Sequence, residues 1–137
     1  MPSRTRSRQR ALQILFLLDA RGQPVEEAID SYCGALFQQE PPERDAFAAE
    51  LVRGAAEHMA ELDALIKKHA EHWRLERMPA VDRSILRLAA YELKHGDMPA
   101  AVIIDEALEL ARKFSGEESA PFVNGVLDAI HREVRAE

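Results

Sequence analysis

The sequence predicts an all-α fold of about six to seven helices, and three observations lead to this prediction. Apolar residues recur at intervals of three and four along most of the chain, a spacing that places them on one side of a helix. Glycines and prolines interrupt this pattern at places that suit helix ends. No segment alternates between apolar and polar residues, and the Asn124-Gly125 pair lies inside a helical pattern instead of between two strands.

The first half of the chain predicts three helices, expected over residues 4–20, from Pro24 to Pro41 and Pro42, and over residues 43–69. Gly22 is expected to stop the first helix, and a proline suits a helix start because its missing N–H has no partner there. The third helix is predicted to be long and unbroken, because its apolar residues keep the 3.6-residue period throughout. Gly54 within it indicates close approach of another helix.

The second half predicts three more helices, over residues 80–94, 99–114 and 119–134. A turn is expected between the first two, and Ser119 is expected to cap the last by accepting a hydrogen bond from a free backbone N–H. Val102 is placed on the buried side of its helix. Gly125 is costly in a helix, so it is expected, like Gly54, to lie where another helix approaches closely.

The composition suits one soluble domain with an uneven charge distribution. The 137 residues are 47% hydrophobic, and no apolar run reaches the roughly 18–20 residues that span a bilayer. Cys33 is the only cysteine, which excludes a disulfide within the chain and fits a cytoplasmic protein. The net charge is −6, but the first ten residues carry a formal +4 and the remainder a formal −10. A basic segment can therefore hold RNA locally, while the acidic remainder could face a basic protein.

Four arginines at alternate positions, Arg4, Arg6, Arg8 and Arg10, supply this basic segment. A guanidinium group offers a planar set of donors that pairs with phosphate and stacks on bases. In a helix the four would divide between two neighbouring faces, and in an extended arm they would all project to one side. The alternative is a solvated tail with no binding role, and the spacing does not decide between the two.

No combination of residues indicates catalysis, a cofactor or a metal site. There is no glycine-rich phosphate loop and no paired nucleophile and base. His69 and His72 have a spacing that metal-binding pairs can show, but they are interpreted as exposed side chains among lysines and arginines. His58, His95 and His131 have no recognisable partners in the sequence. We therefore expect a protein that is not an enzyme.

Several runs of residues, taken together and in order, resemble the NusB family. They are Ala11–Phe16 behind the arginines, Phe47–Gly54, Trp73–Met78 leading into Val81–Leu93, Val102–Ala111 after Pro99, and Phe122–Asp128. The resemblance covers nearly the whole chain. It implies one domain over residues 1–137, built as two packed three-helix bundles over about 1–70 and 71–137 that the long third helix joins.

The resemblance also implies a function and partners. A NusB-like protein is a transcription antitermination factor that binds the single-stranded boxA element of ribosomal RNA leaders. It does so jointly with NusE, a basic ribosomal small-subunit protein, in a complex with RNA polymerase, and without a membrane. Three alternatives stay open: a helical adaptor without RNA binding, a homodimer, or a relative of the NusB-like domain of ribosomal RNA cytosine methyltransferases. The last would need a catalytic domain that this sequence does not contain.

The resemblance implies contact residues as well. RNA contacts are expected from Arg4, Arg6, Arg8, Arg10, Lys113, Phe114, Glu118 and Phe122, and NusE contacts from Phe16, Glu76 and Asp82. The chain departs from the family pattern at three places. Phe16 stands where tyrosine is common, Asp105 stands where asparagine is usual, and Ser115 separates Phe114 from the glycine that commonly follows an aromatic residue directly. Both Phe114 and Phe122 also fit the apolar pattern of their helices, so a buried role is an equal expectation.

Overall fold

The computed structural model describes residues 3–36, 45–70 and 74–135, although not the side chains of residues 32–36. These ranges form helices and turns and contain no strand, so the all-α prediction is confirmed. The helices are α1 (Arg4–Arg21), α2 (Val25–Leu36), α3 (Ala46–Glu57), α4 (Met59–His69), α5 (Ala80–His95), α6 (Ala100–Phe114) and α7 (Ser119–Val134), with a 3-10 turn η1 (Leu75–Arg77). None of the helices in the described ranges is long and apolar enough to cross a membrane.

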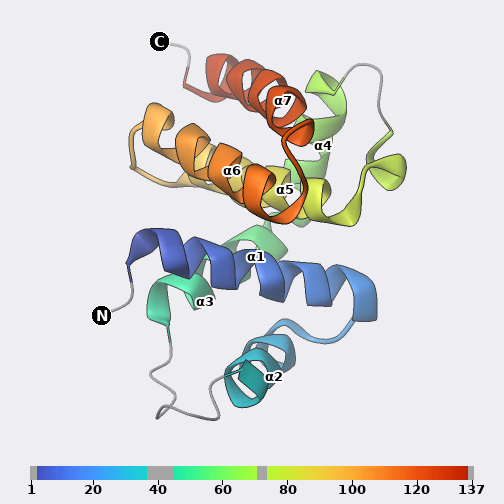
Figure 1. Cartoon of the computed structure of the whole chain (residues 1–137), viewed down its shortest axis with the longest axis vertical. Coiled ribbons are helices and arrows are strands. Elements are labelled where there is room, and N and C mark those ends of the chain that lie inside the picture. Colours follow the sequence, from blue (N-terminus) through green and yellow to red (C-terminus); the bar gives the residue numbers. More distant parts are fainter. Residues whose placement is uncertain (1–2, 37–44, 71–73, 136–137) are drawn as a thin grey trace.

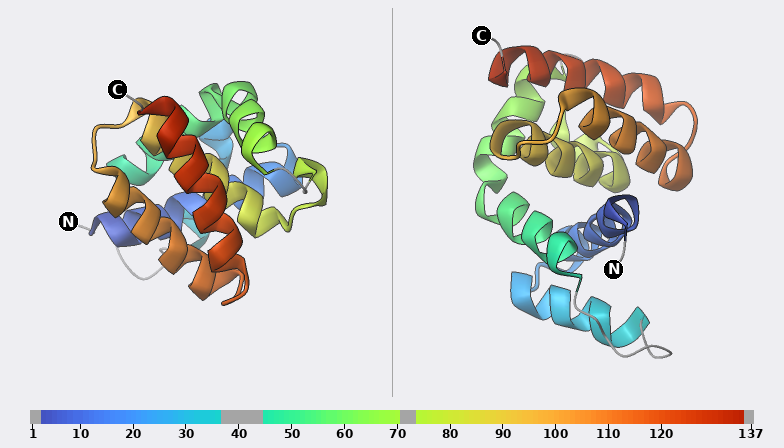
Figure 2. Two further views of the ribbon diagram at one scale, coloured as in Figure 1. Left: turned by 90° about the horizontal axis from the view of Figure 1, so that it is seen from above. Right: turned by 90° about the vertical axis from the view of Figure 1, so that its left-hand side faces the viewer.

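The helices lie in two layers that meet along α5. Helices α1, α2 and α3 form one layer, and α4, α5, α6 and α7 form the other (Figure 1). Helix α5 packs against α4, α6 and α7 in its own layer and against α1 and α3 in the other. The right-hand view in Figure 2 shows the same separation, with α2 and α7 on opposite outer sides. Most of the packing between the layers therefore involves α5.

The long third helix was predicted wrongly, because the segment breaks at His58 into α3 and α4. The buried residues of α3 face α1 and α5, whereas α4 packs on α5 and α7 in the second layer. The chain has to change direction between these two sets of partners. The apolar period continues across the break, so the pattern shows which side of each helix is buried but not the change of partner.

Most predicted helix ends are confirmed. Gly22 closes α1 in the left-handed conformation, with φ of 63°, and its N–H donates to the carbonyl of Leu18. Helix α2 begins directly after Pro24, while its predicted end at Pro41 and Pro42 lies outside the described residues. The predicted cap of α7 is wrong. The hydroxyl of Ser119 donates to a carboxylate of α5 instead of accepting from a backbone N–H.

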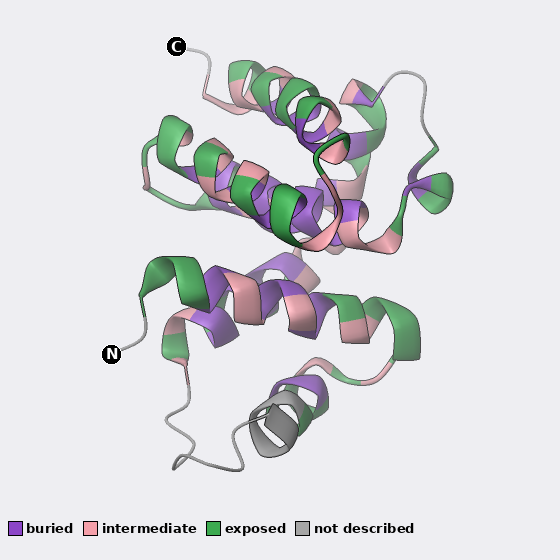
Figure 3. Cartoon of the chain, in the orientation of Figure 1, coloured by how far each residue is buried: buried purple, intermediate pink, exposed green. Residues whose placement is uncertain are grey.

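The core follows the predicted apolar stripes (Figure 3). Leu62, Leu86 and Leu127 lie on α4, α5 and α7, and each is completely buried. Val102 is an exception, since 38% of its surface is exposed on the outer side of α6. Its neighbour Ile103 takes the inward position and is 1% exposed.

The two helical glycines predicted to lie at close contacts differ. A Cβ atom built on Gly54 would lie 2.1 Å from the ring of Tyr91, so α3 and α5 approach closely only because residue 54 has no side chain. This expectation is confirmed. The expectation for Gly125 is wrong, because a Cβ there meets no described atom within 4 Å and the residue is exposed.

These glycines provide a matched pair of substitutions. We expect Gly54→Ala to lower the free energy of unfolding by about 1–3 kcal/mol, because the added methyl overlaps the Tyr91 ring. Gly125→Ala should raise it by about 0.5–1 kcal/mol, because alanine fits an open helical site and restricts the unfolded chain. Urea unfolding followed by circular dichroism measures both. Equal effects of the two substitutions would contradict the close packing of α3 on α5.

Candidate nucleic-acid interface

The arginine-rich start of the chain is a helix and not an extended arm. Ser3 caps α1 by accepting a hydrogen bond from the N–H of Arg6 at 3.1 Å. Because this segment is helical, the four arginines expected to contact RNA lie in different environments. Arg4 and Arg6 are exposed, Arg10 is half-buried, and Arg8 is 2% exposed.

Arg8 points into the boundary between the layers and forms an ion pair with Glu92 of α5. Its Nε and Nη2 atoms donate to the two Glu92 carboxylate oxygens at 2.9 and 2.8 Å. Glu106 of α6 adds a second carboxylate at 4.0 Å. Burial alone would lower the pKa of Arg8, but the hydrogen bond and the charges of the two glutamates outweigh it and raise the pKa.

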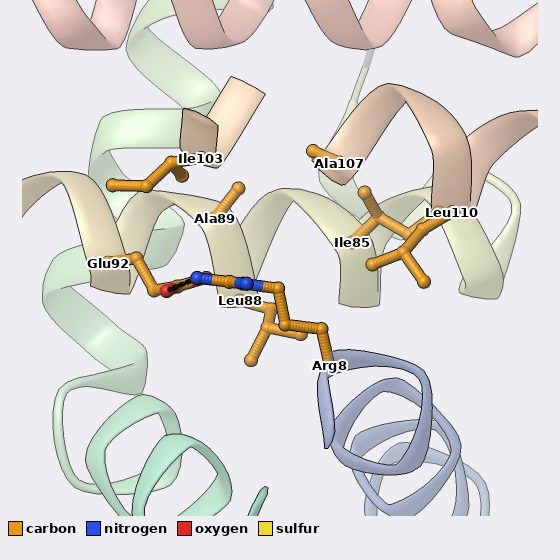
Figure 4. Close-up of a pocket in the computed structure, with 8 residues that line it drawn as sticks. All are labelled: Arg8, Ile85, Leu88, Ala89, Glu92, Ile103, Ala107 and Leu110. Atoms are coloured by element: carbon orange, nitrogen blue, oxygen red, sulfur yellow. Dashed lines mark hydrogen bonds and ion pairs between the residues drawn. The ribbon is translucent and has the colours of Figure 1, made fainter. Parts of the chain in front are cut away.

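Apolar side chains of α5 and α6 surround this ion pair (Figure 4). They are Ile85, Leu88, Ala89, Ile103, Ala107 and Leu110. An ion pair in such surroundings interacts strongly and leaves Arg8 without a surface to offer RNA. The structure therefore places Arg8 in a structural position and not beside Arg4 and Arg6 on the surface.

Arg10 lies between the surface and the α1–α3 contact. Its Nη1 atom donates to Asp45 at 2.9 Å, and the same carboxylate accepts from the hydroxyl of Ser7 at 2.8 Å and the N–H of Ala48 at 3.0 Å. Burial raises the pKa of Asp45, but these hydrogen bonds and the Arg10 charge lower it overall. Asp45 thus caps α3 and ties it to α1.

The exposed start of α1 runs beside α6. The Thr5 hydroxyl donates to Glu106 at 2.7 Å, and the Nζ of Lys113 lies 3.5 Å from the Oε1 of Gln9. Gln9 follows Arg6 by one helical turn, so two exposed cations from distant parts of the sequence, Arg6 and Lys113, lie on one side of the molecule. We call the surface formed by Arg6, Gln9 and Lys113 the basic edge. Arg4 is also exposed, but its guanidinium lies 3.8 Å from the centre of the Phe47 ring on α3.

A carboxylate of α5 stabilises the junction between α6 and α7. Asp82 is 4% exposed, and its two carboxylate oxygens accept from Ser115 at 2.5 Å and Ser119 at 3.2 Å. Gly116 takes a φ of 135° at the turn, which glycine readily adopts. Asp82, expected at a partner surface, is therefore buried under the junction. Ser115, a departure from the family pattern, supplies one of its hydrogen bonds.

The other residues expected at the junction differ in exposure. Phe114 and Phe122 are half-buried and pack against the core, whereas Glu118 is exposed. The ammonium of Lys113 lies 5.5 Å from the centre of the Phe114 ring, a distance that suits a cation–π contact. Each aromatic residue has both a buried and an accessible part. The two expectations for them, base stacking and core packing, stay compatible.

Phe16 and Glu76, the remaining expected partner contacts, lie near the opposite end of α1. Phe16 is 38% exposed, and Asp19 follows it by nearly one turn. Arg83 of α5 donates to Asp19 at 2.5 Å and to the carbonyl of Leu75 in η1 at 3.0 Å. This arginine thereby connects the end of α1 to the turn that carries the exposed Glu76. The pKa of Asp19 is lowered, because the hydrogen bonds and charge of Arg83 outweigh the effect of burial.

Sequence reasoning missed three residues of the basic edge and its support: Thr5, Gln9 and Glu106. Thr5 and Glu106 are 101 residues apart, and Gln9 and Lys113 are 104 apart. No local spacing links such pairs. Only Gln9 carried a signal, because it lies one turn beyond an exposed arginine on the same helix face.

These features define a small two-layer helical protein with a basic edge beside a helix junction. The model of the NusB family matches residues 5–132, and the chain belongs to this family. It is 67% identical over 98% of its length to a transcription antitermination protein NusB of Solibacter usitatus, of which it covers 92%. A NusB of Myxococcus xanthus is 44% identical over 95% of the chain and 95% of that protein.

Solved structures agree with this assignment. The NusB of T. maritima has a TM-score of 0.84 and 36% identity, with 96% of this chain and 92% of that chain covered. NusB in the crystal structure of the antitermination factors NusB and NusE in complex with dsRNA has a TM-score of 0.84 and 28% identity. That comparison covers 95% of this chain and 96% of the other.

The placement of Arg8 generates a stability prediction. We expect Arg8→Ala to lower the free energy of unfolding by about 3–5 kcal/mol, because it leaves the buried Glu92 carboxylate without its partner. Arg6→Ala, the control from the same helix, should change it by less than about 0.5 kcal/mol. Denaturant unfolding of both variants checks this. An Arg8→Ala protein as stable as Arg6→Ala would contradict a structural role for the ion pair.

Proposed function

We propose that this protein is a cytoplasmic antitermination factor that binds boxA-type single-stranded RNA at the basic edge and at the adjacent α6–α7 junction. The contact between Lys113 and Gln9 carries the proposal, because it unites the two segments expected to bind RNA. Arg4, Arg6 and Lys113 supply exposed positive charge in a protein whose net charge is −6. Phe114 and Phe122 add aromatic surface on which bases can stack.

The proposal assigns no catalytic step to the chain. It acts by holding RNA and a NusE-like protein within a transcription complex with RNA polymerase. In the related crystal structure, NusB is present together with NusE and dsRNA. Phe16 and Glu76 form the proposed protein-binding face. Phe16 offers exposed apolar area and Glu76 a charge that suits a basic partner.

A double substitution on the basic edge tests RNA binding. Arg6→Ala with Lys113→Ala should weaken binding of a boxA-type oligonucleotide. The plot of log binding constant against log salt concentration should also become less steep by about 1.4, since each phosphate contact on single strands contributes about 0.7 to its slope. The control is Lys67→Ala with Arg77→Ala, which removes two exposed cations from α4 and η1. The measurement is fluorescence anisotropy at several salt concentrations. If the two double variants bind equally, RNA does not use the basic edge.

We infer that Asp82 positions the α6–α7 junction and does not contact the protein partner directly. Asp82→Asn should lower the melting temperature and weaken RNA binding, because it removes a charged acceptor from Ser115 and Ser119, while leaving NusE binding unchanged. Glu76→Gln should instead weaken NusE binding and leave the melting temperature unchanged. Calorimetric titration with NusE and thermal melting separate the two. Weakened NusE binding by Asp82→Asn at an unchanged melting temperature would restore a recognition role for Asp82.

A further inference from the structure

Three side chains that can bind a metal ion meet where the two layers join, away from the basic edge. His58 lies at the break between α3 and α4, Glu61 in the first turn of α4, and His95 at the end of α5. The Nε2 atom of His95 lies 2.9 Å from one Glu61 carboxylate oxygen, and the Nδ1 atom of His58 lies 3.4 Å from the other. One potential ligand atom from each residue lies within 4.8 Å of the other two.

The surrounding structure holds the two imidazoles together. Their ring centres are 4.0 Å apart with the planes inclined at 23°. The ring of Tyr91 lies 5.5 Å from that of His95, and the same ring packs on Gly54. About a third of each ligand side chain remains exposed, so an ion and a water molecule can reach the cluster from solvent.

The distances suit a small divalent cation. Zinc binds histidine nitrogen and carboxylate oxygen at about 2.0–2.2 Å, which places neighbouring ligand atoms of a tetrahedral site roughly 3.3 Å apart. The two nitrogen–oxygen separations, 2.9 and 3.4 Å, run to different oxygens of Glu61, so the carboxylate lies close to both imidazoles. Because the rings are stacked, one of them must turn for both nitrogens to face a single ion.

We propose that His58, Glu61 and His95 form a binding site for Zn²⁺ or a cation of the same class, with water as a fourth ligand. Two imidazoles and a carboxylate are a ligand set that zinc uses in proteins. The ion would connect the break between α3 and α4 to the end of α5, and would therefore stabilise the junction of the layers. Lys94 competes for the site, because its ammonium lies 2.9 Å from a Glu61 oxygen.

Titration of the full chain with zinc chloride, followed by calorimetry, tests the proposal. The wild type should bind one ion per chain. His95→Gln and Glu61→Gln should each weaken binding at least tenfold, because each removes a ligand. Lys94→Met should strengthen binding several-fold, because it removes a positive charge beside the ion.

Two histidines outside the cluster provide controls. His69 contacts Glu133 at 3.2 Å, and His131 lies on α7, so His69→Gln and His131→Gln should leave zinc affinity unchanged. Circular dichroism establishes that each variant is folded, and zinc should raise the melting temperature of the wild type but not of His95→Gln. A wild type that binds no zinc would overturn the proposal. So would unaltered affinity in His95→Gln and Glu61→Gln, or loss of affinity in either control.

Discussion

The buried ion pair between Arg8 and Glu92 determines how the two layers of this protein fit together. Removing two charges from water is costly, and the cost is recovered only when the charges meet in good geometry, as they do here through two hydrogen bonds. The apolar residues of α5 and α6 around the pair exclude water and strengthen the interaction. A displacement of α1 along α5 would break these bonds, so this contact fixes the start of α1 on α5.

The fixed position of α1 decides which of its residues reach the surface. Arg8 shares the inward side with Ala11, Leu12 and Leu15, all of which are buried. Arg6 lies on the opposite side, where it joins the basic edge. Alternate arginines therefore have different roles because a helix turns by about 100° per residue, which sends residues two apart to opposite sides.

The helices and most of their ends could be predicted from the sequence, because apolar period and helix-end residues are local properties. The break at His58 could not, since it depends on which layer each half of the segment meets. The same limit applies to Arg8 and Asp82, two charged residues that the resemblance to the NusB family assigned to binding surfaces. Each is buried with partners from other helices, Glu92 in one case and Ser115 with Ser119 in the other, and no local pattern reveals such pairings.

Ion pairs between α1 and α5 occur near both ends of α1, and this arrangement bears on how two partners could bind together. Arg8 meets Glu92 near the start, and Asp19 meets Arg83 near the end. From Arg6 to Phe16 the helix rises about 15 Å, a short distance compared with the size of a bound protein. If RNA and a NusE-like protein bind at these two ends as proposed, they lie close enough to touch each other. With α1 fastened to α5 at both ends, we expect any cooperation between them to arise from that direct contact and not from movement within this chain.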